Sequence, residues 1–179
     1  MESDYKKFLE FIKTRKSVRN FVEGKISRNT ILDVLECARW APSGRNNQPW
    51  RIHVVTHITV KSLLAELTED SSIIKSAFLS LVIFLDLERS YDKVKDLQAI
   101  GAFMQNILLA VHATSKLGAV WLGEILNKKE KVNNIFKLST TKYELMGVIA
   151  VGEKDESVEK AGDEERERRP LEEFVDWFQ

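Results

Sequence analysis

The sequence predicts one α+β or α/β domain in which helices pack on a single layer of β-sheet. Its 179 residues suit one compact domain, and an apolar content of 44% is enough to build a sizeable core. Segments with helical spacing of apolar residues are intermingled with short runs of β-branched and aromatic residues. No stretch has the length and apolar character of a bilayer span, so we expect no membrane partner.

The N-terminal half is expected to hold three helices and one strand. Apolar side chains recur at helical spacing in residues 4–14 and again in residues 27–40, where Ser27 is suited to cap the first turn. The proline just beyond this second segment stops the helix. Isoleucine and valine in residues 51–56 favour a short strand, and residues 59–67 return to a helical pattern.

The C-terminal half begins with Leu79–Leu87, a dense β-branched and aromatic run that predicts a central buried strand. The longest helix is expected over residues 92–116, with Gly118 terminating it. Residues 119–123 form either a short strand or an extended loop. A further helix and a further buried strand are expected over residues 128–136 and 143–152.

The end of the chain is expected to be exposed. Residues 153–168 are charge-dense and have no apolar period, so they cannot bury much and predict an arm or a linker. Residues 170–178 are compatible with a last amphipathic turn or short helix. Within the charged segment, Arg166, Arg168 and Arg169 precede a proline and could reach a phosphate, but a solvated run of charges explains them equally well.

Charge and cysteine content narrow the function classes. With 27 basic and 27 acidic residues, the formal net charge is zero, which gives no general reason to expect nucleic acid as a partner. The single cysteine, Cys37, falls in an apolar helical pattern and is interpreted as a buried structural thiol. One cysteine, together with an N-terminus unlike a secretion signal, predicts a soluble cytoplasmic protein.

Metal and dinucleotide chemistry has no support in the sequence. His53, His57 and His112 show neither metal-ligand spacing nor a triad with other polar residues. The chain also contains no Walker motif and no GxGxxG, so it does not predict a Rossmann dinucleotide site.

The segment RKSVR has the side chains that bind a phosphate monoester. Arg15, Lys16, Ser17 and Arg19 bring two guanidinium groups, an ammonium group and a hydroxyl group together within a short turn. Guanidinium groups bind phosphate through paired hydrogen bonds, and the serine adds another. An exposed charged turn is the alternative interpretation, and the segment alone does not decide between them.

Residues 41–50, APSGRNNQPW, form the second candidate segment. Their carboxamide side chains offer both donors and acceptors, which suits the mixed polar edge of a heteroaromatic ring. Two prolines stiffen the loop and reduce the entropy that binding would cost. The alternative is a rigid connection in which Trp50 fills the core, and Trp50 is expected to do so in either case.

Two further glycines mark places where backbone or ligand could approach closely. Gly101 lies in residues 101–110, which we interpret mainly as a core helix and as part of a helix–helix seam between two subunits. Gly123 ends the segment LGAVWLG, whose turn at residues 121–123 could place backbone N–H groups against a cofactor.

The order of these segments resembles the FMN-dependent nitroreductase family over nearly the whole chain. RKSVRNF is followed by a helix, by APSGRNNQPW running into a strand, by QNILLA in a long helix, and then by LGAVWLG, VIAVG and RRPLEE. APSGRNNQPW is the most specific part and the tail is the least specific. The resemblance implies a single domain over residues 1–179 with a three-layer α/β/α sandwich around a mixed, mostly antiparallel sheet.

The same resemblance implies an intertwined homodimer with two FMN molecules at its interface, and an arm of residues 153–179 that packs on the partner subunit. It also implies a set of FMN contacts at matching positions. These are Arg15, Lys16, Ser17 and Arg19 from one subunit, Pro42, Ser43, Gly44 and Asn46 from the other, Leu122 and Gly123 against the flavin ring, and Arg166 and Arg168 at the phosphate, with Arg169 as a rival for the last position.

The activity that the resemblance implies is electron transfer from NAD(P)H through bound FMN to a small aromatic acceptor, such as a nitroaromatic compound or a quinone. No side chain needs to act as acid or base, so no catalytic residue is nominated. One departure from the family is informative: the connection ERSYDKVKD is too short for the helical excursion that covers the pocket in larger members. We therefore expect an open pocket.

Two other functions stay open at this point. The protein could bind flavin for storage or sensing without turnover, which an open pocket without a catalytic side chain would allow. It could also be a helical interaction domain with no cofactor, which a colourless protein unable to take up FMN would favour.

Overall fold

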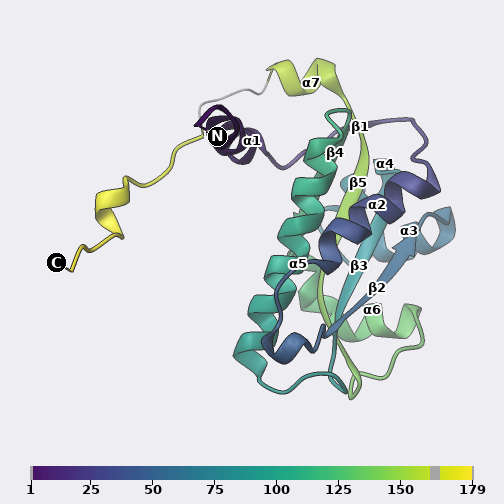
Figure 1. Ribbon diagram of the computed structural model, residues 1–179. Coiled ribbons are helices and arrows are strands. Elements are labelled where there is room, and N and C mark those ends of the chain that lie inside the picture. Colours follow the sequence, from purple (N-terminus) through teal and green to yellow (C-terminus); the bar gives the residue numbers. More distant parts are fainter. Residues whose placement is uncertain (1, 162–165, 179) are drawn as a thin grey trace.

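A computed structural model describes residues 2–161 and 166–178 of the chain and shows three layers, helix, sheet and helix (Figure 1). The middle layer is a five-stranded sheet in which β3 and β5 are central, β2 and β4 flank them, and β1 pairs with the last two residues of β5. The strands are β1 (Phe21–Val22), β2 (Trp50–Val55), β3 (Leu79–Asp86), β4 (Leu117–Leu122) and β5 (Tyr143–Lys154). The predicted α+β sandwich is confirmed.

The sheet differs from the expectation in one respect. Every strand pair that the described residues form is antiparallel, so the expected mixture with parallel pairs is not found there. The reason lies in the connections from β2 to β3 and from β4 to β5. Each of them returns the chain to the sheet at the end where the previous strand stopped, so the two neighbours run in opposite directions.

Helices cover both faces of the sheet. The α-helices are α1 (Glu2–Thr14), α2 (Arg28–Arg39), α3 (Ile58–Ala65), α4 (Ser71–Ser76), α5 (Lys93–Ala113), α6 (Lys129–Ile135) and α7 (Glu156–Ala161), and the 3-10 helices are η1 (Gly44–Asn46), η2 (Glu124–Lys128) and η3 (Leu171–Glu173). α2 and α5 pack on one face, and α3, α4 and α6 pack on the other. The connection between β3 and α5 is short, as predicted.

The central strand β3 shows why these residues form a core. Its side chains point alternately to the two faces: Leu81 and Ile83 pack with α2 and α5, whereas Val82 and Phe84 pack with α3, α4 and α6. All four side chains are buried. A strand that is apolar on both faces therefore requires a helical layer on each side.

The long helix α5 does not end where the sequence indicated. It stops at Ala113, and Ser115 then adopts a left-handed backbone conformation with φ of 61°. The expectation that Gly118 terminates the helix is wrong, because Gly118 already lies in β4. The glycine has a packing role instead: a Cβ atom there would lie 2.5 Å from the side chain of Val18.

Cys37 is exposed rather than buried, so the interpretation as a structural core thiol is wrong. Helix α2 buries only a narrow stripe, formed by Val34 and Ala38, against the sheet and α5. Cys37 precedes Ala38 by one residue, a rotation of about 100° around the helix axis, which turns its side chain away from that stripe. The apolar pattern of this helix therefore predicted more buried residues than the structure shows.

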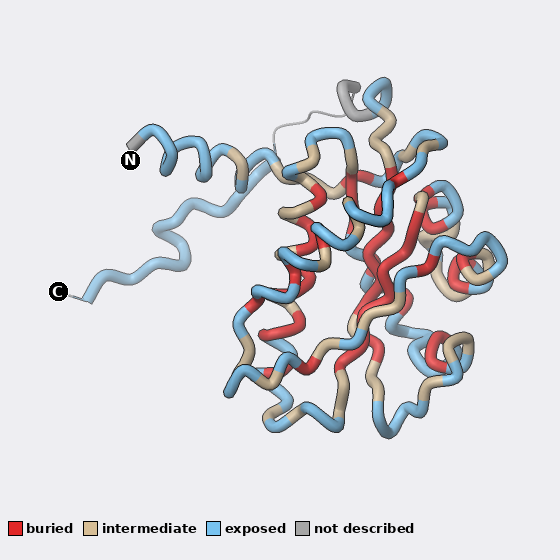
Figure 2. The backbone as a smooth tube through the Cα atoms, turned by 45° about the vertical axis from the view of Figure 1, so that its right-hand side comes forward, coloured by how far each residue is buried: buried red, intermediate tan, exposed pale blue. Residues whose placement is uncertain are grey.

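The two ends of the chain extend away from the sandwich (Figures 1 and 2). β5 runs on to Lys154 and α7 follows it, so the expected arm begins later than residue 153. Residues 162–165 lie outside the described part, and the arm of residues 166–178 then runs away from the body. Large apolar side chains on both segments are exposed to solvent, including Phe8 (58%) on α1 and Trp177 (84%) on the arm. Among the described residues, none of the helices has both the length and the hydropathy of a transmembrane segment.

Candidate functional site

The RKSVR segment lies along the free edge of β4. The backbone N–H of Val18 donates to the carbonyl oxygen of Ala119 at 3.0 Å, and the Val18 side chain is buried against Gly118. This contact fixes the polar residues on either side of Val18. Arg15, Lys16 and Ser17 are partly exposed, and Arg19 is exposed.

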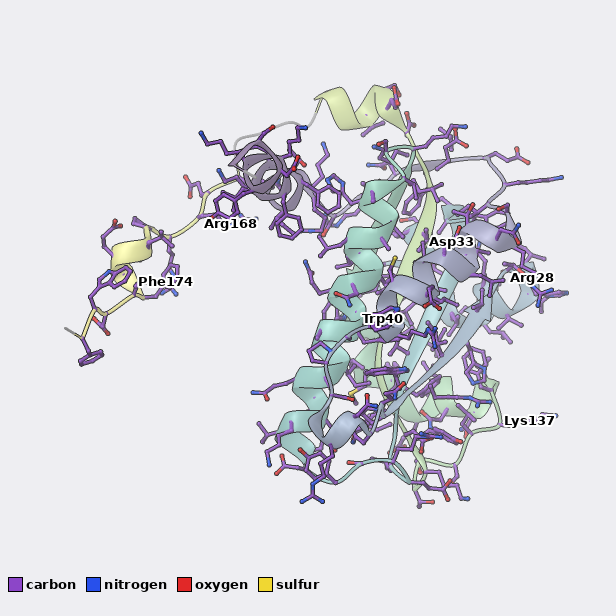
Figure 3. All side chains as sticks on the ribbon, in the orientation of Figure 1. Arg28, Asp33, Trp40, Lys137, Arg168 and Phe174 are labelled. Atoms are coloured by element: carbon purple, nitrogen blue, oxygen red, sulfur yellow. The ribbon has the colours of Figure 1, made fainter. Side chains whose placement is uncertain are left out.

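Three of the predicted phosphate contacts come together although they are far apart in the sequence. The guanidinium group of Arg166 donates to the carbonyl oxygens of Lys13 and Arg15, which places the arm against the end of α1. Arg168 lies beside the same helix (Figure 3). Burial lowers the pKa of Arg15, and the charges of Arg166 and Arg168 lower it further. The three guanidinium groups therefore form a cluster, which we call the arginine cluster.

His112, near the C-terminal end of α5, borders the arginine cluster. Its Nε2 atom lies 3.1 Å from the hydroxyl oxygen of Thr14, and its ring packs on that of Phe11. Burial lowers the pKa of His112, and the charges of Lys154 and Arg15 add to that effect. The surroundings are thus electropositive and suit a dianionic group such as a phosphate.

The Pro42–Gln48 loop occupies the other end of α5. Arg45, Asn46 and Gln48 have positive φ angles of 53°, 55° and 47°, a conformation that residues other than glycine adopt at a cost of about 1–3 kcal/mol each. Pro42, Ser43 and Gly44 line a cavity of about 260 Å³ together with Lys95 and Gln98 of α5. Sequence reasoning missed Lys95 and Gln98, because polar residues three positions apart are common on the exposed face of any helix and do not indicate a binding site.

The turn after β4 offers backbone rather than side chains. Leu122 is buried in the core, so only its main chain can contact a ligand, whereas Gly123 is exposed and has no heavy atom within 4 Å of the position that a Cβ atom would occupy. Just before them, the side chain of Trp121 is 41% exposed. It lines a second cavity of about 320 Å³ with Leu97, Gly101 and other, mostly apolar, residues.

The side chain of Trp121 is a third feature that sequence reasoning missed, because only the backbone of the turn at residues 121–123 was expected to contact a ligand. Two of the residues that line its cavity are charged, Lys129 and Glu144, and their ammonium nitrogen and carboxylate oxygen lie 3.7 Å apart. An apolar hollow with an exposed indole ring favours an aromatic guest, which can stack on the tryptophan. A tryptophan in a short apolar strand gives no signal of this kind, because the same residue type usually fills a core.

The two halves of the predicted cofactor site do not meet within one chain. Asn47 of the loop is hydrogen-bonded to Asp96 near the start of α5, and Thr14 contacts His112 near the end of the same helix. Sixteen residues of helix (112 − 96) correspond to about 24 Å. The cavities also lie on opposite flanks of α5, since Lys95 and Gln98 face one way and Leu97 and Gly101 the other. A single chain thus brings the arginine cluster together but keeps the loop apart from it.

We predict that Gly101→Ala stabilises the protein without its ligand. Gly101 is in the interior of α5, where glycine costs about 1 kcal/mol relative to alanine, and nothing lies within 4 Å of its Cβ position. Urea unfolding of the apoprotein should show a gain of about this size. Gly118→Ala is the matched control: Val18 leaves no room there, so stability should fall by about 1–3 kcal/mol. A loss of stability for Gly101→Ala would contradict this prediction and would be expected if residues 101–110 pack in the seam between two subunits.

The described residues define a class by fold and geometry: an α+β sandwich protein with an arginine cluster at one end of α5 and a cavity on each flank of that helix. The sequence profile of the nitroreductase family matches residues 12–77 and 72–153. The chain is 30% identical over 132 residues to a provisionally assigned NADH dehydrogenase/NAD(P)H nitroreductase of Methanothermobacter thermautotrophicus. The aligned region covers 73% of this chain and 67% of the relative.

Solved structures agree with the profile. A provisionally assigned nitroreductase from Desulfovibrio desulfuricans, crystallised with FMN, is 37% identical, with a TM-score of 0.85 over 96% of this chain and 97% of that one. NADPH:FMN oxidoreductase from Vibrio harveyi has the same fold at 22% identity, with a TM-score of 0.84 over 96% of this chain and 76% of that one. The chain belongs to the nitroreductase family, as its motifs indicated.

Proposed function

We propose that the protein is an FMN-dependent oxidoreductase that passes electrons from NAD(P)H to a small aromatic acceptor. The arginine cluster is the observation that carries this proposal, because Arg15, Arg166 and Arg168 form a preassembled place for the cofactor's phosphate. The residues present fit FMN in other respects. Gly123 leaves its backbone open to a ring, and the cavity beside Trp121 is apolar. The similar chain from Desulfovibrio desulfuricans was crystallised with FMN.

We further propose that the active unit is a homodimer. The loop and the arginine cluster are about 24 Å apart along α5, so they contribute to one cofactor site only if the loop comes from a second copy. Exposed apolar side chains on α1 and on the arm also favour association, because a monomer rarely exposes so many of them together. They include Tyr5, Phe8, Leu171, Phe174 and Trp177.

The roles proposed for the chain follow from charge and position. Bound FMN supplies the hydride and electron chemistry. Arg15, Arg166 and Arg168 hold the phosphate, and the backbone at Gly123 lies against the ring. Arg19, exposed two residues after the Ser17 hydroxyl, supplies positive charge near the pyrimidine edge, where it stabilises negative charge. Lys16 and Ser17 complete the contacts from this subunit, and Pro42, Ser43, Gly44 and Asn46 are those from the partner.

The proposal predicts a yellow protein whose flavin absorbance is bleached by NADH or NADPH in the absence of oxygen. A quinone or a nitroaromatic compound added afterwards should restore the colour, because the cavities are open and none of the described segments covers them. Free FMN with the same nucleotide in the same buffer is the control. Failure of both nucleotides to bleach bound flavin would reject the oxidoreductase function.

A second candidate function is flavin binding without turnover. An open pocket and the absence of a nominated catalytic side chain are compatible with this function as well as with turnover. The same experiment separates the two functions. Flavin that is reduced but is not reoxidised by any acceptor would support storage or sensing. The protein is expected to act in the cytoplasm in either case, on the grounds of its cysteine content.

A further inference from the structure

The short connection between β3 and α5 contacts the strained Pro42–Gln48 loop through Arg89 and Tyr91. We propose that Asp96 is a positioning residue, whose buried carboxylate holds the Pro42–Gln48 loop, through Asn47, in the conformation that meets the flavin. The inference rests on the proposed function, in which Pro42, Ser43, Gly44 and Asn46 contact FMN. It adds a residue that touches neither cofactor nor substrate.

Asp96 is fully buried, although it is a carboxylate in the first turn of a helix. Its two oxygen atoms accept four hydrogen bonds: from the Ser90 hydroxyl at 2.6 Å, from the Asn47 amide at 2.8 Å, and from the backbone N–H groups of Tyr91 and Asp92 at 2.9 and 3.0 Å. Burial alone would raise the pKa of this carboxyl, but these donors hold it below its ordinary value. The buried charge is therefore fully satisfied.

Asn47 is the only one of the four donors that belongs to the loop. Its neighbours Asn46 and Gln48 both have positive φ angles, so the backbone is strained on either side of it. The Asn47 amide nitrogen also donates to the carbonyl oxygen of Arg89 at 2.9 Å. Two hydrogen bonds from one side chain thus fix the centre of the strained segment. Strain of this kind persists only where surrounding contacts determine the conformation.

Tyr91 gives the loop a second support. The guanidinium group of Arg45 lies 4.8 Å from the centre of the Tyr91 ring, a distance suited to a cation–π contact. The ring also covers Gly44, where an added Cβ atom would lie 2.1 Å from the Tyr91 hydroxyl oxygen. The connection between β3 and α5, which is too short to form a lid, therefore holds the loop in place through the Tyr91 side chain. The carboxylate of Asp96 in turn orders this connection, because it accepts hydrogen bonds from Ser90 and Tyr91. We call this set of contacts the clamp.

The test compares Asp96→Asn with Asp92→Asn in the apoprotein and in the FMN-bound protein. Asp92 is the N-cap of the same helix, and its carboxylate pairs with Lys95 of α5, accepting from the backbone N–H at 3.0 Å and lying 3.3 Å from the ammonium nitrogen. Its replacement controls for weakening of the helix start. Asn47→Ala removes the hydrogen bond between the loop and Asp96 and leaves Asp96 with its three other donors. This variant therefore tests the proposal even if Asp96→Asn does not fold.

Hydrogen exchange of the apoprotein measures the clamp without any flavin. The amides of Asn46, Asn47 and Gln48 donate to Ser43 or Gly44 and should be protected in the wild type. In Asp96→Asn and Asn47→Ala we expect their exchange to accelerate by at least about tenfold, and the FMN dissociation constant to rise by a similar factor. Asp92→Asn should change both by less than about twofold, as an exposed cap does not order the loop.

Each outcome has a separate meaning. If loop amides stay protected in both variants, the clamp is wrong. If exchange accelerates but FMN affinity is unchanged, Asp96 orders the loop but does not position it for flavin, and the inference is overturned. A wild-type protein that binds no FMN would instead reject the proposed function, while the exchange data would still report on the clamp.

Discussion

Replacing Arg15 with alanine is expected to weaken FMN binding by about 10- to 150-fold, which corresponds to the loss of a charge-assisted hydrogen bond of about 1.5–3 kcal/mol. The apoprotein should nevertheless be at least as stable as the wild type. Burial and the charges of Arg166 and Arg168 lower the pKa of Arg15, so its positive charge is disfavoured when no anion is present. A residue that costs stability in the apoprotein and adds affinity in the complex is the signature of a binding site.

Isothermal titration of the apoprotein with FMN gives the affinity, and thermal unfolding of the apoprotein gives the stability. Arg169→Ala is the comparison, because Arg169 is the rival for the C-terminal phosphate contact: it lines one cavity with Arg166 and Arg168, but its guanidinium group lies 5.3 Å from the centre of the Phe174 ring. It should change the dissociation constant by less than about threefold, as a solvated arginine does. No loss for Arg15 would identify RKSVR as a surface turn, whereas an equal loss for Arg169 would assign the C-terminal phosphate contact to Arg169.

The regular elements were predictable where one physical signal dominated. Ser27 caps α2, as predicted, because its hydroxyl oxygen accepts from the Thr30 backbone N–H at 3.0 Å. β3 was predictable because a strand buried on both faces has no polar alternation. The strand β1, with two residues, and the helix α4, with six, were missed, since neither is long enough to show a period.

The candidate site was predictable only in its local segments. The residue types in RKSVR and APSGRNNQPW made both segments candidates from the sequence alone. The distance between them could not be predicted in this way, because it depends on the length and position of α5. Lys95, Gln98, Asp96 and the side chain of Trp121 gave no signal, because their roles come from contacts with residues distant in the sequence. The assignment of the FMN contacts to individual residues stays a prediction, which mutation can test.

The assignment of the two segments to different subunits predicts the outcome of mixing two chains that each bind FMN weakly. Homodimers of Arg15→Ala lack the phosphate contact in both sites, and homodimers of Asn46→Ala lack the loop contact in both. In a mixed dimer, Arg15 of the second chain and Asn46 of the first chain are intact and would meet in one site. That dimer should regain one FMN bound with wild-type affinity, while its other site carries both changes.

The mixed dimer is obtained by co-expressing the two chains with different affinity tags and selecting for both tags. Flavin absorbance per dimer then gives the number of tight sites, which should be half that of the wild type. If both segments served one FMN within a single chain, one site would lack Arg15 and the other Asn46, and no tight site would remain. The separation of about 24 Å between the Asn47–Asp96 and Thr14–His112 contacts makes that second arrangement geometrically unfavourable. Recovery of half the tight FMN sites would therefore show that each site takes its two segments from different subunits, as the distance along α5 requires.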